Sequence, residues 1–84
     1  MKAKLYDQIK TSVEVQVKFG NRDIPKGTLG TVVECYDNPE GYAVDLAIPN
    51  ERLVGGFEYE NAILSPDQFG VVDAALKTLN VGDH

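Results

Sequence analysis

Residues 24–36 have the sequence Ile-Pro-Lys-Gly-Thr-Leu-Gly-Thr-Val-Val-Glu-Cys-Tyr, and this stretch decides the fold of the chain. Pro25 fixes its own φ, and Gly27 can adopt the positive φ that the exit of a turn requires. The β-branched run that follows predicts a strand over residues 28–36. Gly30, near the start of that strand, permits a bulge or a close approach of another backbone. We therefore predict a turn that leads into a central strand.

A second strand is predicted over residues 42–48. Its alternation predicts that Tyr42, Val44, Leu46 and Ile48 face the core and that Ala43, Asp45 and Ala47 face outward. On the first strand, one face carries Leu29, Thr31, Val33 and Cys35, and the other carries Val32, Glu34 and Tyr36. The intervening segment 37–41 has the composition of a turn, so the two strands form a predicted hairpin.

Before the hairpin, one clear strand is expected. Residues 13–19 alternate between apolar and polar side chains, which predicts a strand with one solvent-facing side. Residues 20–23 form a predicted loop, which Ile24 anchors to the core. The pattern of residues 1–11 is compatible with either one helical turn or an extended segment, and both interpretations stay open.

After the hairpin, Phe57 and Tyr59 alternate with Glu58 and Glu60, which predicts a further strand. A tight turn is predicted at Asn61-Ala62. A short closing strand is expected to follow at residues 63–64.

Residues 66–81 are predicted to form a short C-terminal helix. Ser65 is a suitable N-cap, Pro66 suits the first helical position, and Gln68 completes a capping box. The apolar face of the helix would carry Val72, Leu76 and Leu79. This helix could cap an open end of the β-structure or pair with the same helix of a second copy, and the sequence leaves both alternatives open.

Length and charge favour a single acidic domain over residues 1–84. The 84 residues include 13 acidic and 8 basic side chains, which give a net charge of −5. A nucleic-acid partner is unfavourable, because its affinity would come largely from Lys and Arg displacing counterions. Lys2, Lys4 and Lys10 lie close together near the N-terminus, where we expect a solvated tail. A basic protein is the partner that an acidic surface favours.

The cellular location and the need for a cofactor are predicted from patterns that the sequence lacks. No run approaches the roughly 20 apolar residues of a membrane span. The first residues lack the apolar core of a secretory signal, so a cytoplasmic location is expected. The single cysteine, Cys35, excludes an intrachain disulfide and a cysteine-based zinc site. We expect no metal and no cofactor.

Catalysis is not expected. Nucleophilic catalysis needs a nucleophile beside a base, and the one histidine is the final residue, His84. Cys35 lies in the middle of a strand and is expected to be a buried structural residue. Glu58 and Glu60 share a strand face and could form a carboxylate or Ca²⁺ site, although a solvated acidic face is the favoured interpretation. We therefore predict no catalytic residues.

The segments Gly27–Glu34 and Gly41–Asp45 resemble a bacterial family of small SH3-like domains of unknown function. That family has a Gly-x-x-Gly-Thr-Val-Val-Glu core followed by a Gly-Tyr-x-Val-Asp/Glu strand. The resemblance covers about residues 5–66 and extends more distantly to barrels of the KOW type. It implies an SH3-like small β-barrel or roll of about five strands, to which the C-terminal helix is added. It implies no catalytic residues.

Tyrosines and acidic residues near the hairpin turn provide the candidate binding site. Tyr36 and Tyr42 flank the turn that contains Asp37 and Glu40, and Glu58 is a further acidic candidate. SH3-like domains use aromatic residues beside acidic ones to bind extended Pro-rich or basic peptides. The alternative is that these rings belong to the core.

The resulting prediction is a non-catalytic protein-interaction module, such as a neutralising or accessory partner of a basic protein. One alternative is an RNA- or ribosome-associated domain of the KOW type. A further alternative is a barrel that binds a small ligand in its mouth.

Overall fold

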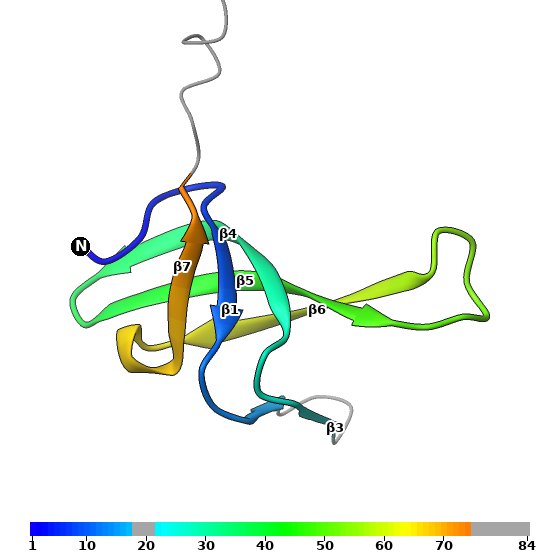
Figure 1. The fold of residues 1–84 in the computed structure, drawn as a ribbon. Helices are drawn as coiled ribbons and strands as arrows, with labels where there is room; N and C mark the ends of the chain where they lie inside the picture. Colours follow the sequence, from blue (N-terminus) through cyan, green and yellow to red (C-terminus); the bar gives the residue numbers. More distant parts are fainter. Residues whose placement is uncertain (18–21, 75–84) are drawn as a thin grey trace, which may run out of the picture.

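The computed structural model describes residues 1–17 and 22–74, and the fold is mainly β (Figure 1). The strands are β1 (Gln8–Thr11), β2 (Val15–Val17), β3 (Arg22–Ile24), β4 (Leu29–Asp37), β5 (Glu40–Pro49), β6 (Phe57–Leu64) and β7 (Phe69–Asp73), and a 3-10 turn, η1 (Pro66–Gln68), precedes β7. Five strands form one sheet in the order β6-β5-β4-β1-β7, while β2 and β3 form a separate ribbon. The prediction of a mainly β fold is confirmed.

The predicted hairpin lies at the centre of the sheet. β4 and β5 pair antiparallel, with Gly30 opposite Leu46 and Tyr36 opposite Gly41. The inward residues Tyr42, Val44 and Leu46 are all fully buried, as their alternation predicts. Gly30 shows the expected close approach of another backbone, because a Cβ atom there would lie 3.0 Å from the Asp45 carbonyl oxygen, and it would also lie 2.6 Å from Val44 Cγ1.

A bulge in β4 changes which of its residues face the core. The register with β5 shifts between Val32 and Glu34. As a result Val32 and Cys35 both pack against the core, although they were predicted on opposite faces. The predicted grouping of Cys35 on one face with Leu29 and Val33 is wrong, because the extra residue of a bulge reverses the faces of the strand beyond it.

The sheet bends so that its distant strands meet across one core. Tyr42 of β5 and Phe69 of β7 pack edge to face, with ring centroids 5.4 Å apart and an angle of 82° between the rings. Such aromatic pairs favour this geometry over a face-to-face stack. The remaining large core side chains are Ile9, Ile24, Val32, Val44, Leu46 and Leu64.

The sheet is not closed into a barrel, which corrects the prediction of an SH3-like barrel. The two edge strands are β6, which pairs with β5, and β7, which pairs with β1. Closure would require hydrogen bonds between the two edges, and none joins β6 to β7 in the described part of the chain. The core is covered by the bend of the sheet and by the separate β2–β3 ribbon (Figure 1).

The predicted C-terminal helix over residues 66–81 is also wrong where the structure describes it. The capping interaction exists, because the Ser65 amide donates to Gln68 Oε1 over 2.9 Å. It starts only the short turn η1, after which Phe69 enters the core and residues 69–73 pair with β1 as β7. Strand pairing and the burial of Phe69 outweigh a helical start that Gly70 weakens. Residues 75–81 lie outside the described residues.

The N-terminal part of the chain is extended. Residues 8–11 form β1, so the extended interpretation of residues 1–11 is correct for this segment. The strand predicted over 13–19 is confirmed at β2, and residues 18 and 19 lie outside the described residues. Arg22 and Asp23 belong to β3 rather than to the predicted loop, because they pair with β2. Ile24 is fully buried, as predicted.

The strand β6 is continuous from residue 57 to residue 64. Asn61 pairs with Asp45 and Ala62 pairs with Val44, so the predicted tight turn at these positions is wrong. The pairing is reinforced because Asn61 Nδ2 donates to Asp45 Oδ1 over 2.9 Å. Beyond the sheet, β5 and β6 continue as a projecting hairpin, the arm, which ends in residues 50–56 (Figure 1).

We expect the substitution Gly30→Ala to destabilise the fold by about 1–3 kcal/mol, because the added methyl group overpacks a full core. Its Cβ would meet Val44 Cγ1 at 2.6 Å and Leu46 Cδ2 at 2.9 Å. The matched control is Gly70→Ala on β7, where nothing lies within 4 Å of the added atom. Urea unfolding of both variants measures the difference in their free energy of unfolding. Equal unfolding midpoints would contradict the close packing at Gly30.

Candidate functional site

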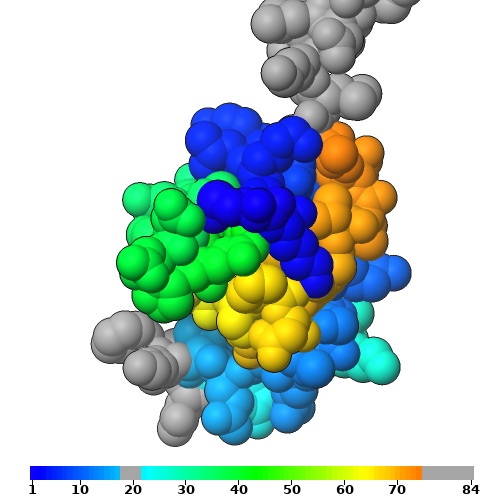
Figure 2. Space-filling view, turned by 90° about the vertical axis from the view of Figure 1, so that its left-hand side faces the viewer, coloured from blue at the N-terminus to red at the C-terminus, as the bar shows by residue number. Residues whose placement is uncertain are grey.

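A pocket of about 640 Å³ lies where the β4–β5 hairpin meets the end of β6, and we call it the hairpin pocket. Its lining includes Tyr36, Pro39, Glu40, Gly41, Ile63 and Gln68. Figure 2 views this end of the molecule and shows the hairpin, in green, beside the end of β6 and η1, in yellow. The pocket therefore combines apolar walls with one carboxylate.

Tyr36 is the exposed aromatic residue of this pocket. It is 39% exposed, and its hydroxyl donates to Glu34 Oε1 over 3.1 Å. This hydrogen bond, together with partial burial and the charge of Glu34, raises the pKa of the Tyr36 phenol. The ring is thus a neutral surface that a partner can contact.

Tyr42 was predicted as a candidate binding residue, but it belongs to the core. Its side chain is 0% exposed, because it occupies an inward position of β5. The hydroxyl accepts hydrogen bonds from the Lys2 amide at 2.9 Å and the Ala3 amide at 3.3 Å, and it donates to Glu40 Oε2. Burial, followed by the bond to Glu40, raises the pKa of Tyr42. Its role is to fix the N-terminal segment and to orient Glu40.

Glu40, one of the predicted binding residues, lines the hairpin pocket, and its carboxylate is held ionised. The hydrogen bond from Tyr42, followed by that from the Lys2 amide at 2.9 Å, lowers the pKa of Glu40 below its ordinary value of 4.5. Both bonds reach the same oxygen, Oε2. Within the described residues, Oε1 has no hydrogen-bond partner, so one oxygen is available to a ligand.

Lys2 is an organising residue that the sequence did not reveal. Its Nζ donates to the Pro66 and Phe69 carbonyl oxygens, and it lies 4.9 Å from the centroid of the Phe69 ring. Lys4 is also engaged, in an ion pair of 3.3 Å with Asp7. Neither lysine therefore belongs to a free tail, although the Lys4 side chain stays 57% exposed to solvent. The backbone acceptors of Lys2 belong to the short turn η1 and β7, where a helix was predicted.

Asp37 lies at the end of β4, beside the pocket, and is exposed to solvent. The next peptide bond, between Asn38 and Pro39, is cis. Asp37 can add to the negative charge around the hairpin turn. Its predicted position beside Tyr36 and Glu40 agrees with the structure.

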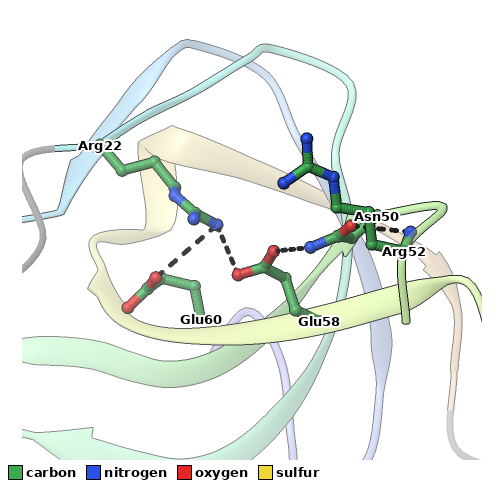
Figure 3. A network of polar contacts seen from close by, with 5 residues as sticks. All are labelled: Arg22, Asn50, Arg52, Glu58 and Glu60. Atoms are coloured by element: carbon green, nitrogen blue, oxygen red, sulfur yellow. Dashed lines mark hydrogen bonds and ion pairs between the residues drawn. The ribbon is translucent and has the colours of Figure 1, made fainter. Parts of the chain in front are cut away.

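Glu58, the fifth predicted site residue, does not join this pocket. It pairs with Ile48 near the arm, whereas Tyr36 and Gly41 pair at the hairpin end of the sheet. Figure 3 shows its network: Glu58 Oε1 accepts from Arg22 at 3.0 Å, and Glu58 Oε2 accepts from Asn50 at 2.6 Å. The hydrogen bond from Asn50, followed by that from Arg22, lowers the pKa of Glu58. Its role is to tie the arm to β3.

Two other predictions concern reactive groups. Cys35 is half-buried against the core, and burial, followed by the charges of Asp7 and Glu34, raises the pKa of its thiol. The nucleophilic thiolate is therefore disfavoured. Among the described residues, no three histidine, cysteine or carboxylate side chains are grouped as a metal site. His84 lies outside those residues.

No helix within the described ranges has the length and apolar character needed to cross a membrane. In comparisons with protein-family models, curated proteins and solved structures, nothing matched the chain. The resemblance of residues 27–34 and 41–45 to small SH3-like domains therefore stays a prediction.

We expect Tyr42→Phe to cost about 1–2 kcal/mol of the free energy of unfolding, because it removes buried hydrogen bonds. The matched control is Tyr36→Phe, which removes one exposed hydroxyl contact and should change stability by less than about 0.5 kcal/mol. Chemical unfolding followed by circular dichroism measures both. A loss at Tyr36 as large as that at Tyr42 would contradict the division into core and surface tyrosines.

We expect part of the stability to be lost in acid through Glu40. Because folding lowers the pKa of Glu40 below 4.5, the contribution of its carboxylate is present above that pH. It is lost as the pH falls through the folded-state pKa. Glu40→Gln should therefore be less stable than the wild type at pH 7, and the difference should shrink below pH 4.5.

Thermal unfolding between pH 7 and pH 3 measures this effect. The control is Glu51→Gln, because the Glu51 side chain lies exposed on the arm and makes no ion pair within the described part of the chain. This control should keep the acid dependence of the wild type. A Glu40→Gln curve that runs parallel to the wild-type curve would contradict the prediction.

Proposed function

We propose that this chain is a non-catalytic protein-interaction module whose hairpin pocket receives a basic side chain of a partner protein. The observation that carries the proposal is the position of the Glu40 carboxylate beside the apolar side chains of Tyr36, Pro39 and Ile63. Lysine and arginine bury their aliphatic stems on apolar surface while their charged groups stay at its edge. A carboxylate beside apolar walls suits both parts of such a side chain.

The electrostatics of the pocket support a cation. Glu40 Oε2 is used by Tyr42 and by the Lys2 amide, and Oε1 has no such partner in the described part of the chain. The lowered pKa of Glu40 keeps its carboxylate charged at neutral pH. Glu34 and Asp37 add negative charge from β4, close to the same turn.

The charge of the whole chain supports a basic protein more than a nucleic acid. The net charge is −5. Several cations are already used within the fold: Lys2 binds backbone carbonyls, Lys4 pairs with Asp7, and Arg22 pairs with Glu58. The RNA-binding alternative therefore has less support. A ligand in a barrel mouth has less support as well, since the sheet is open and Tyr42 and Phe69 fill its interior.

A peptide titration of the full chain tests the proposal. The probe is the peptide acetyl-Pro-Lys-Gly-Pro-Lys-Gly-amide, added to ¹⁵N-labelled protein and followed by NMR. We expect shifts at the amides of Gly41, Ile63 and Ser65, which line the pocket. Ile63→Thr and Glu40→Gln should each weaken binding about three- to tenfold, because they remove an apolar contact and a charge.

Two controls make this test specific. Val72→Thr changes an exposed β-branched residue on the other edge strand, β7, and should leave binding unchanged. The same peptide with both lysines acetylated should bind much more weakly. Equal binding of the acetylated peptide would contradict the proposal. Shifts at Lys10 and Lys26 with an oligouridine probe, and none with the peptide, would instead favour the RNA alternative.

A further inference from the structure

The outer face of the sheet has a floor of small side chains along β5. Since Tyr42, Val44 and Leu46 are buried on the inner side, the alternate residues point outward. These outward residues are Gly41, Ala43, Asp45, Ala47 and Pro49. The largest side chain near the centre of this floor is Asp45, which accepts a hydrogen bond from Asn61.

Large apolar side chains stand on both sides of this floor. Leu29, Val33 and Tyr36 on β4, and Phe57, Tyr59 and Ile63 on β6, are all exposed to solvent. Tyr59 pairs with Ala47, and Ile63 pairs with Ala43, so the register places large residues beside small ones. These large side chains and the floor between them define the surface along β5 that we call the face groove. It is apolar toward its two ends, and Thr31, Asp45 and Asn61 make its middle polar.

Two pockets mark the ends of the face groove. One is the hairpin pocket, which contains Gly41. The other has a volume of about 470 Å³ and is lined by Leu29, Ala47, Pro49, Phe57 and Tyr59, among others. Gly41 and Ala47 are six residues apart on one strand, which corresponds to about 20 Å. One elongated ligand can therefore reach both pockets.

A helix suits this groove better than an extended peptide. The face of a sheet offers side chains but no backbone partners, so an extended segment lying on it leaves its own amides and carbonyls unpaired. A helix satisfies these groups internally, and helices commonly cover apolar faces of antiparallel sheets. At 1.5 Å per residue, about 14 residues, or four turns, span 20 Å.

Charges distinguish the two ends of the groove. Glu34, Asp37 and Glu40 lie at the hairpin end. At the other end, Lys26 lines the second pocket and Lys10 pairs with Leu29. A helix with its basic residues at one end complements this distribution.

We propose that the face groove binds an amphipathic helix of a partner protein, about four turns long, whose basic end lies over the hairpin pocket. The proposal rests on the proposed function, because it extends the hairpin pocket into a longer site. It adds the conformation of the ligand, its length and its orientation.

A synthetic helix tests the proposal on the full chain. The probe is a fluorescent 16-residue peptide with leucines on one helical face and three lysines in one terminal turn, and its binding is measured by anisotropy. A peptide of the same composition with scrambled leucines should bind at least tenfold more weakly. Tyr59→Asn should raise the Kd about tenfold, because it removes a large apolar contact far from Glu40.

The matched control is Tyr6→Asn. Tyr6 is 65% exposed and Tyr59 is 68% exposed, but Tyr6 lies in the turn before β1, outside the face groove. Asparagine also tolerates the positive φ of 70° at this position. This variant should bind the probe as the wild type does. An equal loss of binding in both variants would overturn the proposal.

Orientation is tested with a spin label on the lysine-rich end of the probe. It should broaden the signals of Ile63 more than those of Phe57. Broadening of Phe57 alone would overturn the proposed orientation and with it the proposal.

Other results separate this proposal from the proposed function. If the short lysine peptide binds at Ile63 but Tyr59→Asn leaves the Kd of the helical probe unchanged, the face groove proposal fails and the proposed function stands. If the helix binds at Tyr59 and Glu40→Gln has no effect, the proposed role of the hairpin pocket fails. A dimer in solution that Tyr59→Asn dissociates, or contacts between the groove and residues 75–84 in the free protein, would assign the groove to another occupant and overturn the proposal.

Discussion

The contact between the rings of Tyr42 and Phe69 holds the sheet in its bent shape. These residues belong to β5 and β7, which β4 and β1 separate in the sheet, yet their ring centroids are 5.4 Å apart. Two strands that lie three positions apart can meet in this way only if the sheet folds over its own core. The same tyrosine orients Glu40, and the same phenylalanine supports Lys2. Packing inside the core thus determines the position of the carboxylate on the surface.

Sequence alone predicts the central hairpin because local patterns determine it. The alternation around Tyr42 and the turn before it identify β5, and Gly30 identifies a close approach. β7 could not be predicted in the same way, since Ser65 and Gln68 do form the capping interaction of a helix start, with Pro66 at its first position. The structure continues as a strand because Phe69 enters the core and pairs with Thr11, which is distant in sequence. Long-range contacts of this kind leave no local pattern.

The candidate site was predictable in part for the same reason. Tyr36, Asp37 and Glu40 lie together because one turn connects them. The alternation of β5 already places Tyr42 in the core, so the error was to include this inward residue in the binding site. On β6 the structure reverses the expectation that Glu58 and Glu60 form a solvated acidic face. Phe57 and Tyr59 face solvent, while the two glutamates lie on the side of Arg22. Alternation defines two faces but does not say which one is inside. Here ion pairs with β3 stabilise the charged residues on the inner side.

The open edge of β6 gives these inward carboxylates another consequence. An exposed edge strand of eight residues without proline or lysine is a template on which further copies can add. Charged side chains that point inward from an edge are one of the means by which natural sheets prevent such growth. Glu58 and Glu60 are inward-pointing charges of this kind, and Arg22 holds them on that side of the edge strand. The ion pairs that fasten the arm to the ribbon therefore also keep in place the carboxylates that disfavour addition of a like-charged strand to this edge.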